Sequence, residues 1–122
     1  MFDRTVLCVS GPDAKPFLQN LVTNDVTKLK NNIIYSALLT PQGKLVTDFF
    51  LVDLGQDILI DVNSEVGDTL LKLLNLYKLR ADISITKTDL KVSTGINSKP
   101  QKGLEDPRHP KMGWRYYGDD DL

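Results

Sequence analysis

The chain has 122 residues, a length that suits one domain or one lobe of a larger protein. Its 15 basic and 16 acidic residues give a net charge of -1, which provides no electrostatic basis for nucleic-acid binding. The single cysteine, Cys8, excludes an internal disulfide, and with one histidine, His109, no metal-ligand spacing is present. No apolar stretch approaches the ~20 residues of a membrane span, so we expect a soluble cytoplasmic protein without a membrane partner.

Turn residues and hydrophobic periodicity divide the chain into strands and helices. One helix is expected to begin with Ser10 as its cap and Pro12 in its first turn, and a second opens at residues 63–65. Residues 41–43, Pro-Gln-Gly, predict a tight turn that joins two strands into a hairpin. In chain order we expect a strand (5–9), a helix (10–21), three strands (33–40, 44–52, 58–62), a helix (63–79) and two strands (82–86, 90–93).

This order predicts an α+β fold, in which an antiparallel or mixed sheet carries two helices on one face, akin to the split β-α-β arrangement. From about residue 97 the chain becomes polar and rich in Pro and Gly, yet it holds the only Trp. We therefore expect one lobe over residues 1–96 and an extended tail over residues 97–122 that docks onto another surface. The apolar stripe of the second helix is predicted to comprise Val66, Leu70, Leu73, Leu74 and Tyr77, widened by Leu71, Leu76 and Leu79.

Asp48 is the first candidate functional residue, because it lies in a strand that is apolar on both faces. Side chains alternate along a strand, so Asp48 shares a face with Val46, Phe50 and Val52. A strand of this kind is usually covered, and a buried carboxylate costs several kcal/mol unless it is partnered or faces a polar cavity. Asp48 is therefore either an acid at the wet end of the strand, bonded to a backbone amide or an arginine, or an acid that lines a ligand cavity.

Four further polar residues are candidates, and Asn63 allows two interpretations. Asn24 and Asp25 follow the first helix, where both side chains can bond local backbone, and Asn63 is suited either to cap the second helix or to contact a ligand. Asp61 raises the same burial question as Asp48. It lies one residue from the end of its strand, where we expect it to reach water more easily.

Five segments in order resemble the GcvT/YgfZ family. Residues 17–26 (FLQNLVTNDV) resemble its "FL-x-x-L-x-TNDV" stretch, and residues 38–44 (LLTPQGK), running on to Asp48, resemble its hairpin. Residues 62–64 (VNS) are similar to its turn into a helix. Two further segments resemble the YgfZ branch. They are YKLRAD at residues 77–82, and DPR at 106–108 with GWR at 113–115.

The resemblance implies a tetrahydrofolate-binding lobe. Family members hold tetrahydrofolate in a central cavity between lobes, and in the aminomethyltransferase branch one of two adjacent hairpin acids lies near the reacting nitrogen of the folate. Here the first of those positions is Thr47 and the second is Asp48, so Asp48 matches the functional acid. Asn63 matches the asparagine that holds the pterin. Asn24 and Asp25 are expected to shape the edge of the cavity.

Three functions remain open at this stage. The first is a folate-binding lobe of the YgfZ type that serves iron–sulfur protein maintenance, in the cytoplasm or, for a eukaryote, the mitochondrial matrix. The second is an enzyme, an aminomethyl-transferring lobe with Asp48 as its electrostatic or general-base group. The third is an inactive fragment that keeps the fold. Because the "K-G-C-Y-x-G-Q-E" signature of the YgfZ type is missing, we expect the N-terminal portion of a longer protein, partnered by further lobes or another chain.

Overall fold

A computed structural model of the chain describes residues 4–21, 33–40, 42–54, 57–95, 104–105 and 114–118. Five of its strands form one sheet in the order β2-β3-β4-β1-β5, and every neighbouring pair is antiparallel. These strands are β1 (Arg4–Ser10), β2 (Ile33–Leu39), β3 (Leu45–Asp53), β4 (Ile58–Asn63) and β5 (Ser84–Lys87). Within the described ranges, no helix is long and apolar enough to cross a membrane.

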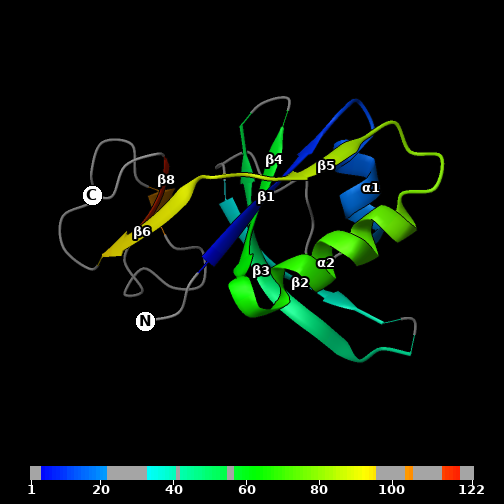
Figure 1. Ribbon diagram of the computed structural model, residues 1–122, viewed down its shortest axis with the longest axis horizontal. Helices are drawn as coiled ribbons and strands as arrows, with labels where there is room; N and C mark the ends of the chain where they lie inside the picture. Colours follow the sequence, from blue (N-terminus) through cyan, green and yellow to red (C-terminus); the bar gives the residue numbers. More distant parts are fainter. Residues whose placement is uncertain are drawn as a thin grey trace.

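Two helices, α1 (Ala14–Leu21) and α2 (Ser64–Tyr77), cover one face of this sheet, here called the helix face (Figure 1). Since β1 lies between β4 and β5 and is antiparallel to both, β4-α2-β5 is a split β-α-β unit, and the predicted fold class is confirmed. The core between helices and sheet is built from apolar side chains, with the buried hydroxyl residues Ser36 and Thr47 beside them. It includes Phe17 and Leu18 of α1, Leu70 and Leu74 of α2, and Leu7, Phe49, Leu51 and Ile60 of the sheet.

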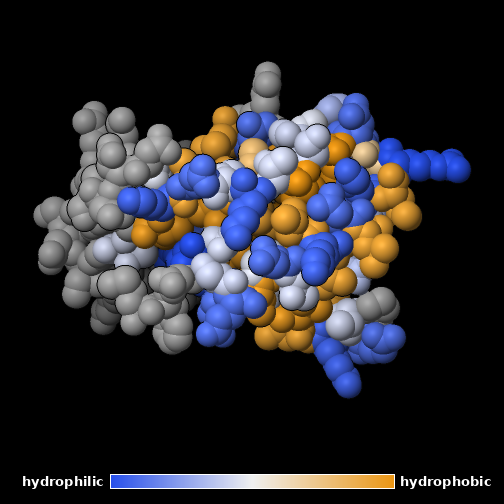
Figure 2. Space-filling view, in the orientation of Figure 1, coloured by the Kyte–Doolittle hydropathy of each residue, from blue (hydrophilic) through white to orange (hydrophobic). Residues whose placement is uncertain are grey.

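The start of α2 agrees with the sequence prediction. Asn63 is the N-cap, and its side-chain Oδ1 accepts a hydrogen bond of 2.9 Å from the backbone N–H of Glu65. The predicted widening of the apolar stripe is wrong near the C-terminal end, because Leu76 and Leu79 are 66% and 85% exposed. Figure 2 accordingly shows apolar side chains at the surface on the side of the molecule where the helices lie.

Helix α1 begins four residues later than predicted. Ser10 is the last residue of β1 and pairs with Ser84, so it does not cap the helix. Gly11 follows with φ +116°, and a Cβ at this position would lie 2.3 Å from the backbone oxygen of Asp82. This close approach forces a turn between β1 and α1, and the helix begins only after it.

A second sheet packs on the other face of the five-stranded sheet, here called the second face. It contains β6 (Lys91–Gly95), β7 (Leu104–Glu105) and β8 (Trp114–Gly118) in the order β6-β8-β7. Val92 and Tyr117 pack against an apolar cluster on the second face formed by Val6, Ile33, Phe50, Val52 and Leu59. Residues 114–118 therefore form a paired strand, although the division into a lobe (1–96) and a tail (97–122) stays a prediction.

Candidate functional site

Asp48 and Asn63 lie side by side on the second face of the sheet. The register pairs Phe49 with Val62 across β3 and β4, so one step further along the same register sets Asp48 opposite Asn63. On the next strand, Arg4 of β1 is the partner of Asn63. Because residues opposite each other in antiparallel strands point to the same face, Asp48, Asn63 and Arg4 form a line across three strands, here called the polar row.

Asp48 is exposed, which agrees with an acid at the wet end of the strand, the first of the two interpretations, whereas the expectation that the strand is covered at this position is wrong. In the described part of the chain, the second sheet contacts this face at the apolar cluster of Phe50 and Val52 and at Asp61, and Asp48 lies beyond these contacts. Its Oδ2 accepts a hydrogen bond from the Tyr35 hydroxyl of β2, while Oδ1 has no hydrogen-bond partner among the described residues. The carboxylate is therefore held in place by one neighbour and still available to a ligand.

The Thr47 side chain is buried, and its hydroxyl donates to the backbone oxygen of Asp48 at 3.1 Å. Of the two hairpin positions singled out in the sequence, only the second, Asp48, therefore presents a side chain to the second face.

Asn63 caps helix α2 through its side-chain oxygen, and its side-chain amide nitrogen can still donate a hydrogen bond to a ligand. Its Oδ1 accepts from Glu65, as described above, which fixes the orientation of the amide. In the part of the chain that the structure describes, nothing accepts a hydrogen bond from the amide nitrogen. The capping role and a ligand-binding role are thus compatible. The other two candidates, Asn24 and Asp25, lie outside the described residues, and their role stays a prediction.

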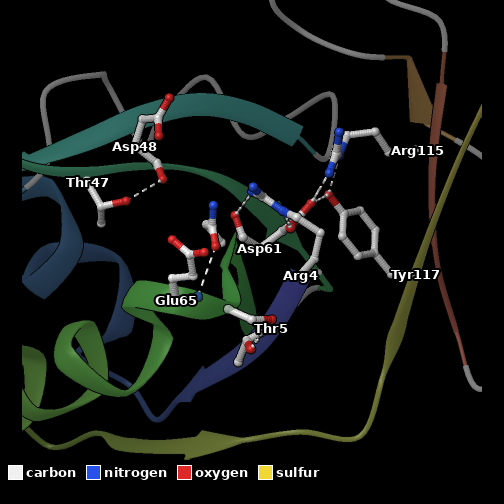
Figure 3. Close-up of polar contacts among 10 residues, drawn as sticks. Arg4, Thr5, Thr47, Asp48, Asp61, Glu65, Arg115 and Tyr117 are labelled. Carbon is white, nitrogen blue, oxygen red and sulfur yellow. Dashed lines mark hydrogen bonds and ion pairs between the residues drawn. The ribbon is translucent and has the colours of Figure 1, made fainter. Parts of the chain in front are cut away.

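Asp61 lies on the same face of β4, two residues before Asn63 of the polar row. It is fully buried at 0% exposure. The expectation that it reaches water more easily than Asp48 is therefore wrong. Arg4 donates from Nε to Oδ1 at 2.7 Å, and Arg115 of β8 donates to Oδ2 at 3.0 Å from Nε and 2.6 Å from Nη2. The Tyr117 hydroxyl donates to the same oxygen at 2.7 Å. Figure 3 shows Arg4 and Arg115 converging on Asp61 while the Asp48 carboxylate points away from it.

The protonation states in this cluster are fixed by burial and charge. Burial alone lowers the pKa of Arg115, but the Asp61 carboxylate and the Tyr117 oxygen outweigh it, so the pKa of Arg115 is raised. Burial and then the charge of Asp61 raise the pKa of Tyr117 far above its ordinary value. The guanidinium therefore stays charged and the phenol stays neutral. Because its donors come from two other strands, β1 and β8, we assign Asp61 a structural role.

Sequence reasoning did not identify Arg4 or Tyr35. The signal available for both was strand alternation. Arg4 is two positions from Val6 and Tyr35 is two positions from Ile33, so each points to the same face as that neighbour. Val6 and Ile33 belong to one apolar cluster. Arg115 lay within the GWR motif, but no local pattern relates it to a residue 54 positions earlier in the chain.

The comparison with protein families follows this geometry. Residues 4–94 match the family described as the GCVT N-terminal domain. The chain belongs to this family. The matched segment includes every residue of the polar row, and the family prediction made from the sequence is confirmed.

The similar proteins include iron-sulfur cluster assembly factors and aminomethyltransferases. The iron-sulfur cluster assembly factor IBA57 homologue of Neurospora crassa is 38% identical over 94 residues, 70% of this chain and 21% of its own length. The IBA57 protein of Homo sapiens is 28% identical over 97% of this chain and 42% of its own length. The aminomethyltransferase of Chromobacterium violaceum is 45% identical over 56 residues, 42% of this chain and 16% of its own length.

A solved structure has the same fold. The glycine cleavage system aminomethyltransferase T from Bartonella henselae superposes with a TM-score of 0.68 at 20% identity, over 73% of this chain and 25% of that chain. The chain thus spans well under half the length of each of these relatives.

Proposed function

We propose that this chain is the tetrahydrofolate-binding lobe of a YgfZ-type protein that serves iron–sulfur protein maintenance. Membership of the GCVT family supports folate use in general, and the IBA57 relatives carry iron–sulfur cluster assembly in their names. The IBA57 matches cover up to 97% of the chain, whereas the aminomethyltransferase match covers 42%. The names place the assembly factors in mitochondria, so the mitochondrial matrix is the proposed compartment for a eukaryotic source.

The observation that carries the proposal is the register of β3 and β4, because one step beyond the Phe49–Val62 pair sets Asp48 opposite Asn63 on the second face. A pterin presents ring N–H and amino donors beside ring nitrogen and carbonyl acceptors. Asp48 Oδ1 can accept from a pterin donor, and the Asn63 amide nitrogen can donate to a pterin acceptor. Bound tetrahydrofolate would carry the one-carbon unit, while the chain's own residues bind and orient the ring. Because Asp48 is exposed while Arg4 and Asn63 are half-buried, we propose that further lobes or another chain complete the cover of the polar row.

Calorimetric titration of the folded chain with tetrahydrofolate tests this proposal. We expect binding by the wild type and a loss of about tenfold or more in affinity for Asp48→Asn, because a charge-assisted hydrogen bond is removed. Asp89→Asn is the matched control, since Asp89 is also an exposed carboxylate and lies outside the polar row. Folded wild-type chain that takes up no tetrahydrofolate contradicts the proposal and favours an inactive fragment that keeps the fold.

The iron–sulfur part of the proposal needs a separate experiment in cells. We expect deletion of the encoding gene to lower the activity of iron–sulfur enzymes, and the full-length wild-type protein to restore it. The Asp48→Asn protein, produced at the same level, is expected to restore it poorly, while Asp89→Asn restores it fully. Normal iron–sulfur enzyme activity in the deletion strain contradicts this part of the proposal and leaves folate binding to be judged by calorimetry.

An aminomethyltransferase lobe is the second candidate, favoured by the 45% local identity to the Chromobacterium enzyme. In this function Asp48 would act as the electrostatic or general-base group during one-carbon transfer. The single acid of the hairpin, with Thr47 buried beside it, argues against this candidate. Incubation with aminomethylated carrier protein and tetrahydrofolate separates the two, because only a transferase forms methylene-tetrahydrofolate.

A further inference from the structure

Arg4 is the cationic end of the polar row. It lies one strand from Asn63 and two strands from Asp48, which corresponds to about 10 Å across the sheet. The row therefore begins with a carboxylate, continues with an amide and ends with a guanidinium. A ligand that spans it meets hydrogen-bond acceptors at the Asp48 end and donors at the Arg4 end.

The guanidinium of Arg4 is held in one orientation. Nε donates to Asp61 Oδ1 at 2.7 Å, and Nη2 donates to the Asp61 backbone oxygen at 2.8 Å. Two bonds to one residue fix the plane of the group before any ligand arrives. Nη1 has no hydrogen-bond partner in the described part of the chain, and the side chain is 23% exposed. Arg4 thus retains a donor that is oriented and in reach of solvent.

Among the described residues, positive charge exceeds negative charge around Asp61. One buried carboxylate faces the guanidinium groups of Arg4 and Arg115, and Tyr117 adds a neutral hydroxyl, so this described set carries a net charge of about +1. Arg115 is only 8% exposed and its donors face Asp61 and Tyr117. Of these two guanidinium groups, that of Arg4 is therefore the more accessible to a ligand. Asp48, at the far end of the row, forms no ion pair with it among the described residues.

We propose that Arg4 is a ligand-binding residue that donates a hydrogen bond from Nη1 to an oxygen of the molecule held by Asp48 and Asn63. The inference rests on the proposed function, so that molecule is a tetrahydrofolate. A folate has two kinds of oxygen acceptor, the carbonyl of the pterin ring and the carboxylates of the glutamyl tail. Both are groups that a guanidinium binds well.

Calorimetry with Arg4 variants tests this contact. We expect Arg4→Gln to weaken tetrahydrofolate binding about tenfold or more, and the charge-matched control Arg80→Gln, at an exposed position away from the row, to leave it unchanged. Arg4→Lys keeps the charge beside Asp61 but loses the planar fork, and we expect a several-fold loss from it. If Arg4→Gln does not fold, the affinity of Arg4→Lys tests the contact in its place.

Two additional measurements separate ligand contact from a purely structural role. If Arg4 binds the ligand through charge, wild-type affinity falls with added salt more steeply than that of Arg4→Gln. A tetrahydropterin without the glutamyl tail then locates the oxygen: an equal loss for both ligands indicates the ring carbonyl, and a loss confined to tetrahydrofolate indicates the tail. Unchanged affinity in folded Arg4→Gln and Arg4→Lys overturns the inference while leaving the proposed function standing. Failure of the wild type to bind overturns both.

Discussion

Asp48 and Asp61 lie on the same face of one sheet, on neighbouring strands, yet their surroundings are opposite. Asp61 is fully buried and receives hydrogen bonds from two arginines and a tyrosine. Asp48 is exposed and receives one side-chain hydrogen bond, from Tyr35. The difference shows that the fold uses the Asp61 carboxylate internally, whereas the exposed Asp48 carboxylate is the one that we propose to bind a ligand. A carboxylate whose acceptor sites are filled from two strands, β1 and β8, has little capacity left for a new partner.

The largest effect on stability is expected from Asp61→Ala. Removing this carboxylate leaves Arg115 buried without its anion, and we expect the free energy of unfolding to fall by about 3–5 kcal/mol. Urea denaturation measures this loss. A change below about 1 kcal/mol would show that Asp61 is not the internal partner of both arginines, and it would remove the contrast with Asp48.

Arg115→Ala is expected to have the next largest effect. Arg115 donates twice to Asp61, and its guanidinium lies 4.0 Å from the centroid of the Phe50 ring. Because Asp61 keeps Arg4 and Tyr117, we expect a loss of about 2–3 kcal/mol in the free energy of unfolding. Arg80→Ala, an exposed arginine, is the control in the same urea experiment. Equal effects of the two substitutions would mean that β8 contributes nothing to the burial of Asp61.

Burial of Tyr117 predicts that the stability of the fold depends on pH. The pKa of Tyr117 is raised in the folded state, first by burial and then by the charge of Asp61, above the ordinary tyrosine value of about 10. Above that pH the unfolded chain loses the tyrosine proton while the folded chain keeps it, so stability falls as pH rises, by about 1.4 kcal/mol per pH unit. Urea denaturation between about pH 9 and 11 measures this slope.

Tyr117→Phe is the control for this slope, because it removes the titrating hydroxyl while keeping the ring. We expect it to be about 1 kcal/mol less stable than the wild type at neutral pH and to lose this part of the slope. An identical slope in wild type and Tyr117→Phe would contradict a neutral, buried Tyr117 hydroxyl.

The smallest effect on stability is expected from Asp48→Ala. The side chain is exposed and its one partner, Tyr35, keeps access to water, so we expect a change within about 0.5 kcal/mol. The same substitution is expected to abolish tetrahydrofolate binding. Asp48→Ala therefore affects binding and leaves stability nearly unchanged, whereas the main effect of Asp61→Ala is on stability. A destabilisation as large as that of Asp61→Ala would identify Asp48 as a structural residue.

The elements were predictable from the sequence where their signals are local. Pro41, Gln42 and Gly43 mark the hairpin, and Asn63 with Glu65 marks the start of α2, because a turn and a cap depend on neighbouring residues. The start of α1 was not predictable in this way. It depends on the contact between Gly11 and the backbone of Asp82, 71 positions later.

The same limit applies to the two acids. Apolar residues on both faces of β3 indicated a covered strand, and the apolar cluster on the second face confirms this for Phe50 and Val52. How far the cover extends is set by β6 and β8, so the exposure of Asp48 could not be read from β3. Asp61 was misjudged because its partners Arg4 and Arg115 lie 57 and 54 residues away in the sequence.

The most direct test of the contrast between the two acids is to follow their carboxyl-carbon NMR signals while tetrahydrofolate is added to the folded chain. If Asp48 contacts the ligand and Asp61 holds the fold together, the Asp48 signal shifts in a saturable manner and the Asp61 signal stays in place. A stationary Asp48 signal at ligand saturation, or a saturable shift of Asp61 larger than that of Asp48, would contradict the account.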